Sequence, residues 1–306
     1  MRRMTIPATA CVAAFLAAPA IAAPQPVLLS CGGERLAVTF GERSATVVFG
    51  GDTIEMPQAT SADGARYEKA GDPSTWFWNK GDLGTLSIRG KTLPACAPAA
   101  QVYTASGNEP GWRLDVWQDG WFSFRPQEGA RVLVTPGPKA DVDGDVTRYT
   151  IDLGGKPLAV EARRGVCMDT MTGMPHPDSV TVSIDGRTLN GCGGAPSSLL
   201  TGAEWAVTSI GDKAADPGQK VTIGFGGDGQ MAGKGPCNRY MGPWAISGEG
   251  LSIGPAAATM MACPGTAMDD ERAFFDILNA VNRFEIAADG ALVLHAADGK
   301  TIRARR

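Results

Sequence analysis

Six cysteines constrain the fold of this 306-residue chain more than any other feature. They are Cys31, Cys96, Cys167, Cys192, Cys237 and Cys263. An even number of cysteines in an exported protein predicts disulfides, and six cysteines allow fifteen pairings. Sequential pairing (Cys31–Cys96, Cys167–Cys192, Cys237–Cys263) is favoured, because each bridge then closes within one compositional unit.

The N-terminus has the pattern of a secretory signal peptide over residues 1–22. Arg2 and Arg3 precede an apolar run, and Ala20-Ile21-Ala22 supplies a small-x-small cleavage site. The seventh cysteine, Cys11, lies within this segment and is interpreted as part of the signal rather than as a lipid anchor. No other apolar run approaches the roughly 18 residues of a membrane helix. We therefore expect a periplasmic or secreted protein, cleaved near Ala22, with no membrane span.

Linker-like composition predicts three domains after the signal. Ala97-Pro98-Ala99-Ala100 follows the second of the six cysteines, and residues 193–198 (Gly-Gly-Ala-Pro-Ser-Ser) follow the fourth. The expected domains are 23–98, 101–195 and 199–306. Short runs of alternating residues, broken by Gly, Asp and Pro, predict a mainly β protein. The first domain is expected to be an antiparallel β-barrel and the last an α+β domain with one helix.

Net charge argues against nucleic acid as a partner. The whole chain carries a formal charge of −4, and removing Arg2 and Arg3 with the signal makes it −6. Each of the three units is mildly acidic, so no basic footprint for nucleic acid is present. Mild acidity suits a cationic partner.

A strand with two tryptophans marks the candidate binding surface of the first unit. Trp76 and Trp78 share one face at period two, Phe77 takes the other, and Lys80 continues the Trp face before a Gly81-Asp82 turn. The tryptophans are expected to be core residues, since buried Trp commonly organises small β domains. Lys80 is either a solvated surface lysine or a cation presented to a partner.

Residues 27–97 resemble the periplasmic inhibitors of c-type lysozyme, the MliC/PliC family. In that family a Ser-Gly-x-x-Tyr loop and a Lys-Gly turn enter the lysozyme cleft. Here Tyr67 and Lys80 match, but the loop serine falls on Asp63. The resemblance implies a lysozyme-binding set of Asp63, Gly64, Tyr67, Lys80 and Gly81, with Tyr67 bracing the first loop. Unlike serine, ionised Asp63 has no proton to donate, and it adds negative charge beside the two cleft carboxyls.

The middle unit begins with Gly107-Asn108-Glu109-Pro110-Gly111-Trp112. Alternation over 112–117, an Asp119-Gly120 turn and the run 121–124 predict a hairpin. With its two cysteines, the unit resembles an uncharacterised bacterial envelope domain with a Gly-Asn-Glu-Pro-x-Trp signature, which implies location rather than activity. An acid–base set of Glu109, Asp169 and His176 is conceivable, but a turn, a capping acid and a surface histidine explain them better. Zinc ligation by Cys167, Asp169, His176 and Cys192 is disfavoured, because their spacing matches no zinc pattern.

The last unit resembles the META/HslJ family over nearly its full length. The resemblance rests on Trp205, Phe225, residues 235–242, residues 259–264 and Glu271, with Pro236 where the family usually has Gly. A capping-box-like start at Thr266 and Asp269 predicts a helix whose buried face carries Phe274, Ile277, Leu278 and Val281. The family is linked to heat-shock response and to envelope or drug tolerance. Asn238 and Arg239 are assigned to holding the turn beside a disulfide rather than to binding.

The chain carries no sequence pattern of an enzyme. Its two histidines, His176 and His295, lie in different units, and no metalloprotease helix, nucleophile elbow or phosphate loop occurs. We therefore expect a non-enzymatic binding or protective protein without cofactor or metal, and a c-type lysozyme as its partner. The alternative is an envelope-stress protein whose inhibitor-like barrel no longer binds lysozyme and whose partners are envelope components.

Overall fold

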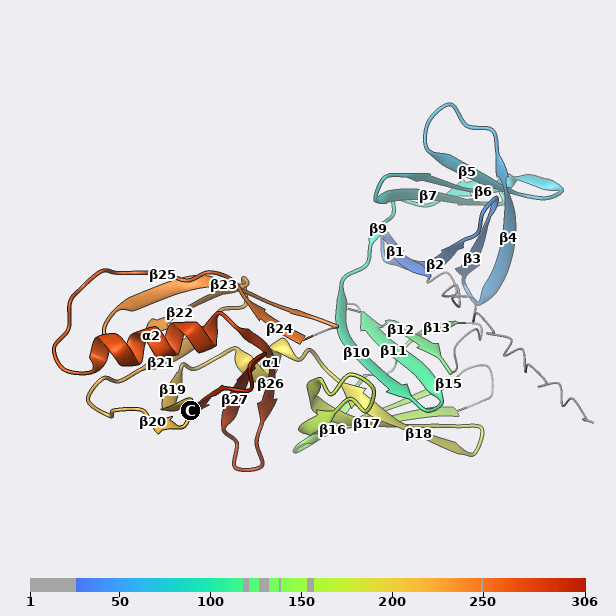
Figure 1. Cartoon of the computed structure of the whole chain (residues 1–306). Coiled ribbons are helices and arrows are strands. Elements are labelled where there is room, and N and C mark those ends of the chain that lie inside the picture. Colours follow the sequence, from blue (N-terminus) through green and yellow to red (C-terminus); the bar gives the residue numbers. More distant parts are fainter. Residues whose placement is uncertain (1–25, 118–120, 127–131, 138, 153–156, 249) are drawn as a thin grey trace, which may run out of the picture.

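The computed structural model describes residues 26–117, 121–126, 132–137, 139–152, 157–248 and 250–306. The signal segment, Cys11 and the Asp119-Gly120 turn lie outside these residues. The described chain is mainly β, and its strands form three antiparallel sheets in chain order (Figure 1). Each sheet has its own cluster of buried hydrophobic residues and one disulfide. The pairing is the sequential one that the sequence favours.

The first sheet has the strand order β8-β7-β6-β5-β4-β3-β2-β1-β9. The strands are β1 (Val27–Cys31), β2 (Glu34–Phe40), β3 (Ser44–Phe49), β4 (Asp52–Ala59), β5 (Ala65–Lys69), β6 (Asp72–Lys80), β7 (Leu83–Ile88), β8 (Lys91–Thr92) and β9 (Ala97–Pro98). Gly84 of β7 exchanges two backbone hydrogen bonds with Cys96, at 2.9 and 2.8 Å, so the sheet curls back on itself as a barrel. The buried Cys31–Cys96 bridge ties β1 to this closure.

The second sheet has the order β13-β12-β11-β10-β18-β17-β16-β15-β14. The strands are β10 (Gln101–Asn108), β11 (Gly111–Trp117), β12 (Trp121–Arg125), β13 (Leu133–Pro136), β14 (Asp141–Asp143), β15 (Val146–Asp152), β16 (Pro157–Met168), β17 (Pro175–Ile184) and β18 (Arg187–Gly193). Trp112, Leu114 and Val116 are buried, as the alternation over 112–117 predicts. The Cys167–Cys192 bridge joins β16 to β18 across β17.

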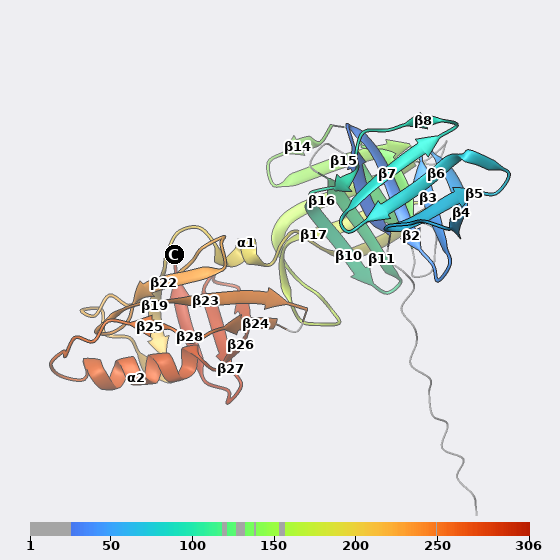
Figure 2. The same ribbon diagram turned by 90° about the horizontal axis from the view of Figure 1, so that it is seen from above.

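The third sheet has the order β24-β23-β22-β21-β19-β28-β27-β26, with β20 paired to β19 and β25 to β23. The strands are β19 (Trp205–Ile210), β20 (Lys213–Ala214), β21 (Thr222–Phe225), β22 (Gln230–Lys234), β23 (Arg239–Ser247), β24 (Gly250–Ile253), β25 (Ala257–Ala258), β26 (Val281–Ile286), β27 (Leu292–Ala296) and β28 (Thr301–Arg305). Helix α2 (Ala267–Leu278) packs against one side of this sheet (Figure 2). Phe274, Ile277 and Leu278 carry its buried face.

Helix α2 differs from its prediction at both ends. The Thr266 side chain makes no capping bond to the backbone; its hydroxyl instead donates to the Asp270 carboxylate at 2.8 Å. The capping box is therefore wrong. Val281 begins strand β26 rather than continuing the helix, although its side chain is buried in the same core.

Both expected linkers are partly structured. Ala97–Pro98 pairs with β1, because its backbone closes the first sheet. Gly193 ends β18, and Ser197–Leu200 forms a short helix, α1, so the sequence missed this second helix. Met174 of the middle unit packs against the core of the third sheet. The Gly, Pro and Ser content of these two segments predicted linkers without regular structure, whereas parts of both segments form strand or helix.

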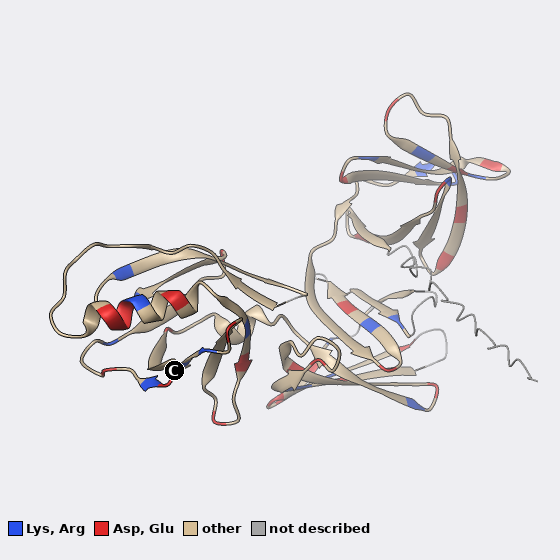
Figure 3. Cartoon of the chain, viewed as in Figure 1, with Lys and Arg blue, Asp and Glu red and all other residues tan. Residues whose placement is uncertain are grey.

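Charged residues are interspersed over all three sheets (Figure 3). Basic and acidic positions lie close to each other along α2 and on several strands. In this view the described residues show no large group of charges of one sign. Within the described residues, no helix has the length and apolar character needed to cross a membrane. The same residues include no group of three or more His, Cys, Asp or Glu placed to hold a metal ion.

Candidate functional site

Lys80 lies at the tip of the β6–β7 hairpin of the first sheet. It pairs with Leu83 across a two-residue turn, in which Gly81 has a φ of +60°. A positive φ is open to glycine at little cost, which explains the residue at this position. The Lys80 side chain is 58 % exposed, so its ammonium group projects from the sheet. Gly81 and Lys80 therefore form a small, protruding cationic tip.

The two tryptophans of β6 lie on the outer face of the sheet. Phe77 is fully buried in the first core, whereas Trp76 and Trp78 are half-buried. The expectation that the tryptophans are core residues is wrong. Period two requires only that Trp76 and Trp78 share a face, and Phe77 occupies the inner one, packed near Phe40 at 6.3 Å between ring centroids.

Arg66 of β5 covers part of this outer face. Its guanidinium carbon lies 4.3 Å from the Trp76 ring centroid, and its Nε atom is 2.7 Å from a carboxylate oxygen of Glu68. Trp78 is the cross-strand partner of Arg66. Cation–π contact and an ion pair together restrain the arginine. Sequence reasoning assigned no role to Arg66; its position two residues after Gly64, on the strand that pairs with the Trp strand, was the available signal.

The loop before β5 is held onto the β6 strand by one indole group. Trp78 donates from Nε1 to the Asp63 carbonyl at 2.8 Å, and the Ser61 hydroxyl donates to the same oxygen at 2.6 Å. Gly64 has a φ of +65°, and a Cβ atom there would lie 2.4 Å from the Asn79 carbonyl oxygen. Glycine is required because the loop crosses so close to the strand. This contact places Asp63 directly beside the lysine tip.

Asp63 and Lys80 form an ion pair. The Lys80 Nζ atom is 2.5 Å from Asp63 Oδ2, and the carboxylate is 62 % exposed. The hydrogen bond from Lys80, and then its charge, hold the pKa of Asp63 below its ordinary value. Sequence reasoning considered only repulsion between Asp63 and the carboxyl groups of a lysozyme. In the folded chain Asp63 instead pairs with Lys80.

Tyr67 lies apart from the exposed members of the predicted set. Its side chain is 7 % exposed and belongs to the first core, where its ring centroid is 5.8 Å from that of Phe40. The structure thus brings Asp63, Gly64, Lys80 and Gly81 together at the surface and sets Tyr67 behind them. From there Tyr67 can support strand β5 but offers a partner almost no surface.

The polar residues of the middle unit serve the loop between β16 and β17. Asp169 accepts hydrogen bonds from the Thr172 backbone and hydroxyl at 2.7 and 2.9 Å, and from the Asn108 amide at 3.1 Å. Partial burial raises the pKa of Asp169, but these hydrogen bonds outweigh it and leave the pKa below its usual value. His176 Nδ1 lies 2.9 Å from the Gly194 carbonyl oxygen. Cys167 and Cys192 are joined to each other, so their thiols are not free to bind zinc.

A buried polar network holds the turn beside the third disulfide. Glu271 of α2 accepts backbone hydrogen bonds from Cys237 at 3.0 Å and Asn238 at 2.6 Å, and the Asn238 amide donates to its other oxygen at 2.7 Å. The side-chain oxygen of Asn238, Oδ1, accepts from the Met261 backbone N–H at 2.7 Å and from the Thr259 hydroxyl at 2.8 Å. Asn238 therefore has the turn-holding role that the sequence assigns to it, whereas Arg239 points to the exposed side of β23.

Family comparisons match two parts of the chain. Residues 30–94 match the family model described as membrane-bound lysozyme-inhibitor of c-type lysozyme (MliC). Residues 198–306 match the META domain model. The chain contains an MliC domain and a META domain. The candidate surface around Lys80 lies in the MliC domain, and the Glu271 network lies in the META domain.

Two matches in a comparison with solved structures both have low TM-scores. An NMR structure of a protein from Burkholderia xenovorans is 27 % identical over 36 % of this chain and 85 % of its own, with a TM-score of 0.31. A crystal structure of BBS1N in complex with ARL6DN is 12 % identical over 93 % of this chain and 92 % of its own, with a TM-score of 0.15. A comparison with curated proteins finds no match.

Proposed function

We propose that the MliC domain inhibits a c-type lysozyme and that Lys80 is the cation that enters the cleft. The observation that carries this proposal is the family match over residues 30–94 together with the exposed Lys80 tip on a two-residue turn. The glycine after Lys80 has open space around its Cα, so nothing widens the tip there. A narrow cationic projection suits a concave site lined by carboxylates.

The chemistry of the target supports a lysine in this role. A lysozyme cleft holds two carboxyl groups, one of which has a raised pKa. An ammonium group inserted between them gains charge-assisted hydrogen bonds and displaces the substrate. The neighbouring loop, fixed by Gly64 and the Trp78 indole, would form the second wall of contact.

Asp63 weakens this mechanism in the native chain. Its carboxylate already occupies Lys80 at 2.5 Å, so a lysozyme must displace it or accept it into the cleft. In the second case a third negative charge joins the two carboxyls, which is unfavourable. We therefore expect native inhibition to be weaker than inhibition by the Asp63→Ser variant, which frees Lys80 and restores a hydroxyl donor.

Inhibition of lysozyme-catalysed cell-wall lysis tests the proposal. Lys80→Ala should weaken binding by about 2–5 kcal/mol, the range for truncating one partner of a buried charge pair. Lys91→Ala is the matched control, because Lys91 is an exposed lysine of the same sheet beyond the other end of β7. Equal inhibition by native protein, Lys80→Ala and Lys91→Ala would remove Lys80 from the mechanism.

The Asp63–Lys80 ion pair favours a second candidate function. In this alternative the barrel no longer binds lysozyme, and the chain acts as a non-enzymatic envelope-stress protein through its META domain. The META/HslJ resemblance, the disulfides and the signal-like N-terminus support an exported location for either function. Native protein without inhibition, combined with inhibition regained in Asp63→Ser, would support the alternative.

A further inference from the structure

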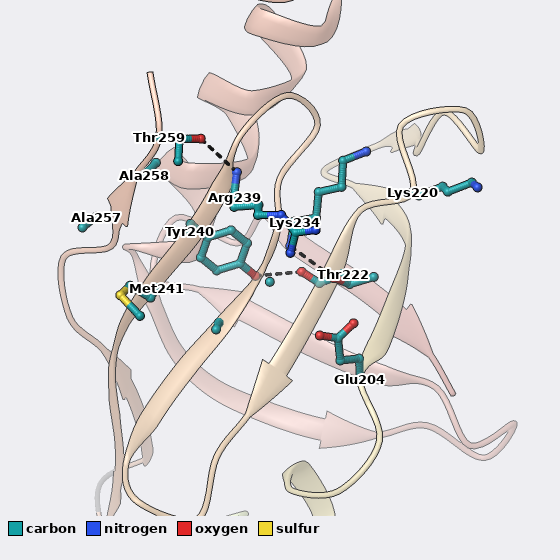
Figure 4. Close-up of a pocket in the computed structure, with 12 residues that line it drawn as sticks. Glu204, Lys220, Thr222, Lys234, Arg239, Tyr240, Met241, Ala257, Ala258 and Thr259 are labelled. Carbon is teal, nitrogen blue, oxygen red and sulfur yellow. Dashed lines mark hydrogen bonds between the residues drawn. The ribbon is translucent and has the colours of Figure 1, made fainter. Parts of the chain in front are cut away.

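A hollow lies on the surface of the META domain. Its volume is about 640 Å³, and strands β21, β22, β23 and β25 contribute to its walls (Figure 4). Tyr240 also lines the hollow, and its ring packs against Phe274 of α2 at 5.5 Å between ring centroids. The hollow therefore adjoins the hydrophobic core at Tyr240, whereas the exposed residues Arg239 and Met241 lie on its solvent side.

Cationic side chains gather at this hollow. Lys234 and Arg239 are direct cross-strand partners on β22 and β23, and Lys220 lines the same hollow. Like charges placed directly opposite each other destabilise a sheet. Among the described residues, none of these three cations lies within 4.0 Å of a carboxylate oxygen. Within the described chain, no direct ion pair therefore offsets the repulsion between Lys234 and Arg239.

Hydrogen bonds orient the two paired cations without neutralising them. Lys234 Nζ donates to the Gln219 carbonyl at 2.6 Å, which leaves two of its three donors available. The Arg239 backbone is fixed by the Thr259 hydroxyl at 3.3 Å, and its guanidinium is on the exposed face. The Glu271 network holds the turn just before Arg239. The Lys234 ammonium group is therefore positioned by a hydrogen bond, and Arg239 is positioned through its backbone.

Small and apolar side chains form much of the remaining lining. Ala232, Ala257 and Ala258 form part of the lining, and Met241 covers one side. One carboxylate, Glu204, also lines the hollow and lies at the opposite end from Arg239 and Thr259 in Figure 4. A ligand held by Lys234 and Arg239 would therefore have the apolar side chains of Ala257, Ala258 and Met241 on one side and the single acid, Glu204, on the other (Figure 4).

We propose that this hollow binds a small organic anion, with a phosphate or carboxylate group at Lys234 and Arg239 and an apolar body over the alanines. Arginine recognises both anions in a bidentate geometry, and lysine adds a point charge. The volume falls within the range of about 300–1,000 Å³ typical of small-molecule pockets. The site goes beyond lysozyme inhibition, because it lies in a different domain and uses none of the residues around Lys80.

Isothermal titration of the full-length exported protein with phenyl phosphate tests the site. We expect a Kd on the order of 0.1–1 mM, which is in reach of a fragment of this size in a preformed pocket. Lys234→Gln and Arg239→Gln should each weaken binding roughly tenfold or more, since each removes a charge-assisted hydrogen bond. Arg272→Gln is the matched control, because it removes one exposed positive charge from α2 of the same domain. Glu204→Gln should tighten binding.

Two further measurements separate a built site from general charge attraction. Phenol tests the apolar body alone and inorganic phosphate the charge alone, and both should bind at least tenfold more weakly than phenyl phosphate. Without ligand, Arg239→Gln should raise the melting temperature by about 1–3 °C, because it removes the repulsion with Lys234. Absence of phenyl phosphate binding, equal losses in Arg239→Gln and Arg272→Gln, or equal binding of phenol would each overturn the proposal.

Discussion

Removing the carboxylate of Glu271 should destabilise the META domain more than any other single polar substitution discussed here. Glu271→Ala leaves three N–H groups without their acceptor: the backbone N–H groups of Cys237 and Asn238 and one N–H of the Asn238 side-chain amide, which keeps its weaker bond to the Met261 carbonyl at 3.3 Å. Glu271 is 7 % exposed and Asn238 2 %, so water reaches these donors poorly. An orphaned buried donor costs about 1–3 kcal/mol. Because neighbouring effects are not additive, we expect a total loss of about 3–5 kcal/mol.

Glu271→Gln is the graded control for this prediction. The amide oxygen can still accept both backbone N–H groups, but its NH₂ group then faces the Asn238 NH₂ group, and one hydrogen bond is lost. We expect a loss of about 1–2 kcal/mol for this variant. Charge alone, rather than hydrogen bonding, would make the two variants equally unstable.

Hydrogen exchange read by mass spectrometry is the appropriate assay, because a chain with three cores need not unfold in one step. Peptides covering residues 231–246 should exchange faster in Glu271→Ala, with Glu271→Gln intermediate. Peptides of the first sheet should be unchanged. Protection of residues 231–246 that stays at the native level in Glu271→Ala would refute the claim that this carboxylate holds the turn.

Three further predictions concern the first sheet. Gly64→Ala should lower the free energy of unfolding in urea by about 1–3 kcal/mol, because φ is +65° and the Asn79 carbonyl oxygen lies 2.4 Å from the new Cβ. Gly81→Ala should lower it by only about 1–2 kcal/mol, because φ is positive there too but the new Cβ meets open space. Replacing Cys31 and Cys96 by Ser should cost roughly 4 kcal/mol, since the bridge closes a 65-residue separation; a loss below 1 kcal/mol would contradict the loop-entropy reasoning. Because Lys80 lowers the pKa of Asp63, the ion pair persists to pH values below the ordinary carboxyl pKa and is lost only as pH falls through the lowered pKa. The ratio of native to Asp63→Ser inhibition should therefore be flat from about pH 5 to 8 and rise only below about pH 4; a change near pH 6 would exclude Asp63 as its cause.

The positions of several strands and the cysteine pairs follow from sequence patterns. The runs 36–40 and 46–49 lie within β2 and β3, and the expected cysteine pairs are the ones that the folded chain forms. The strand runs depend on turns and on neighbours close in the chain, whereas the cysteine pairs follow from the division of the chain into units. Period two assigns Trp76 and Trp78 to one face, but the closing of the barrel decides which face is inside. Sequence alone could not decide that step.

The candidate site was predicted in part, because some of its features depend on local sequence and others depend on how two strands pair. Lys80 on a turn is a local property and is visible in the sequence. The contact between Asp63 and Lys80 depends on the register that pairs Ala65 with Asn79 across β5 and β6. The same register brings Arg66 opposite Trp78. A shift of one residue would turn these side chains to the other face, so the pairing cannot be read from residue types.

The exposed cations of the two matched domains differ in their neighbours: Lys80 has an acidic partner, whereas Lys234 lies opposite another cation, Arg239. This difference affects how each site would bind an external acid. In the MliC domain the Lys80 ammonium has a carboxylate of its own chain at 2.5 Å, so binding an external acid exchanges one ion pair for another. In the META domain Lys234 and Arg239 face each other, and neither forms an ion pair with a carboxylate of the described residues, so binding an external anion relieves a repulsion. Exchange of equivalent exposed partners yields little net free energy, whereas neutralising opposed like charges is favourable. The native sequence is therefore electrostatically better prepared for an anion at the META hollow than for a lysozyme at Lys80, and Asp63→Ser would shift this balance toward Lys80 by removing its ion-pair partner.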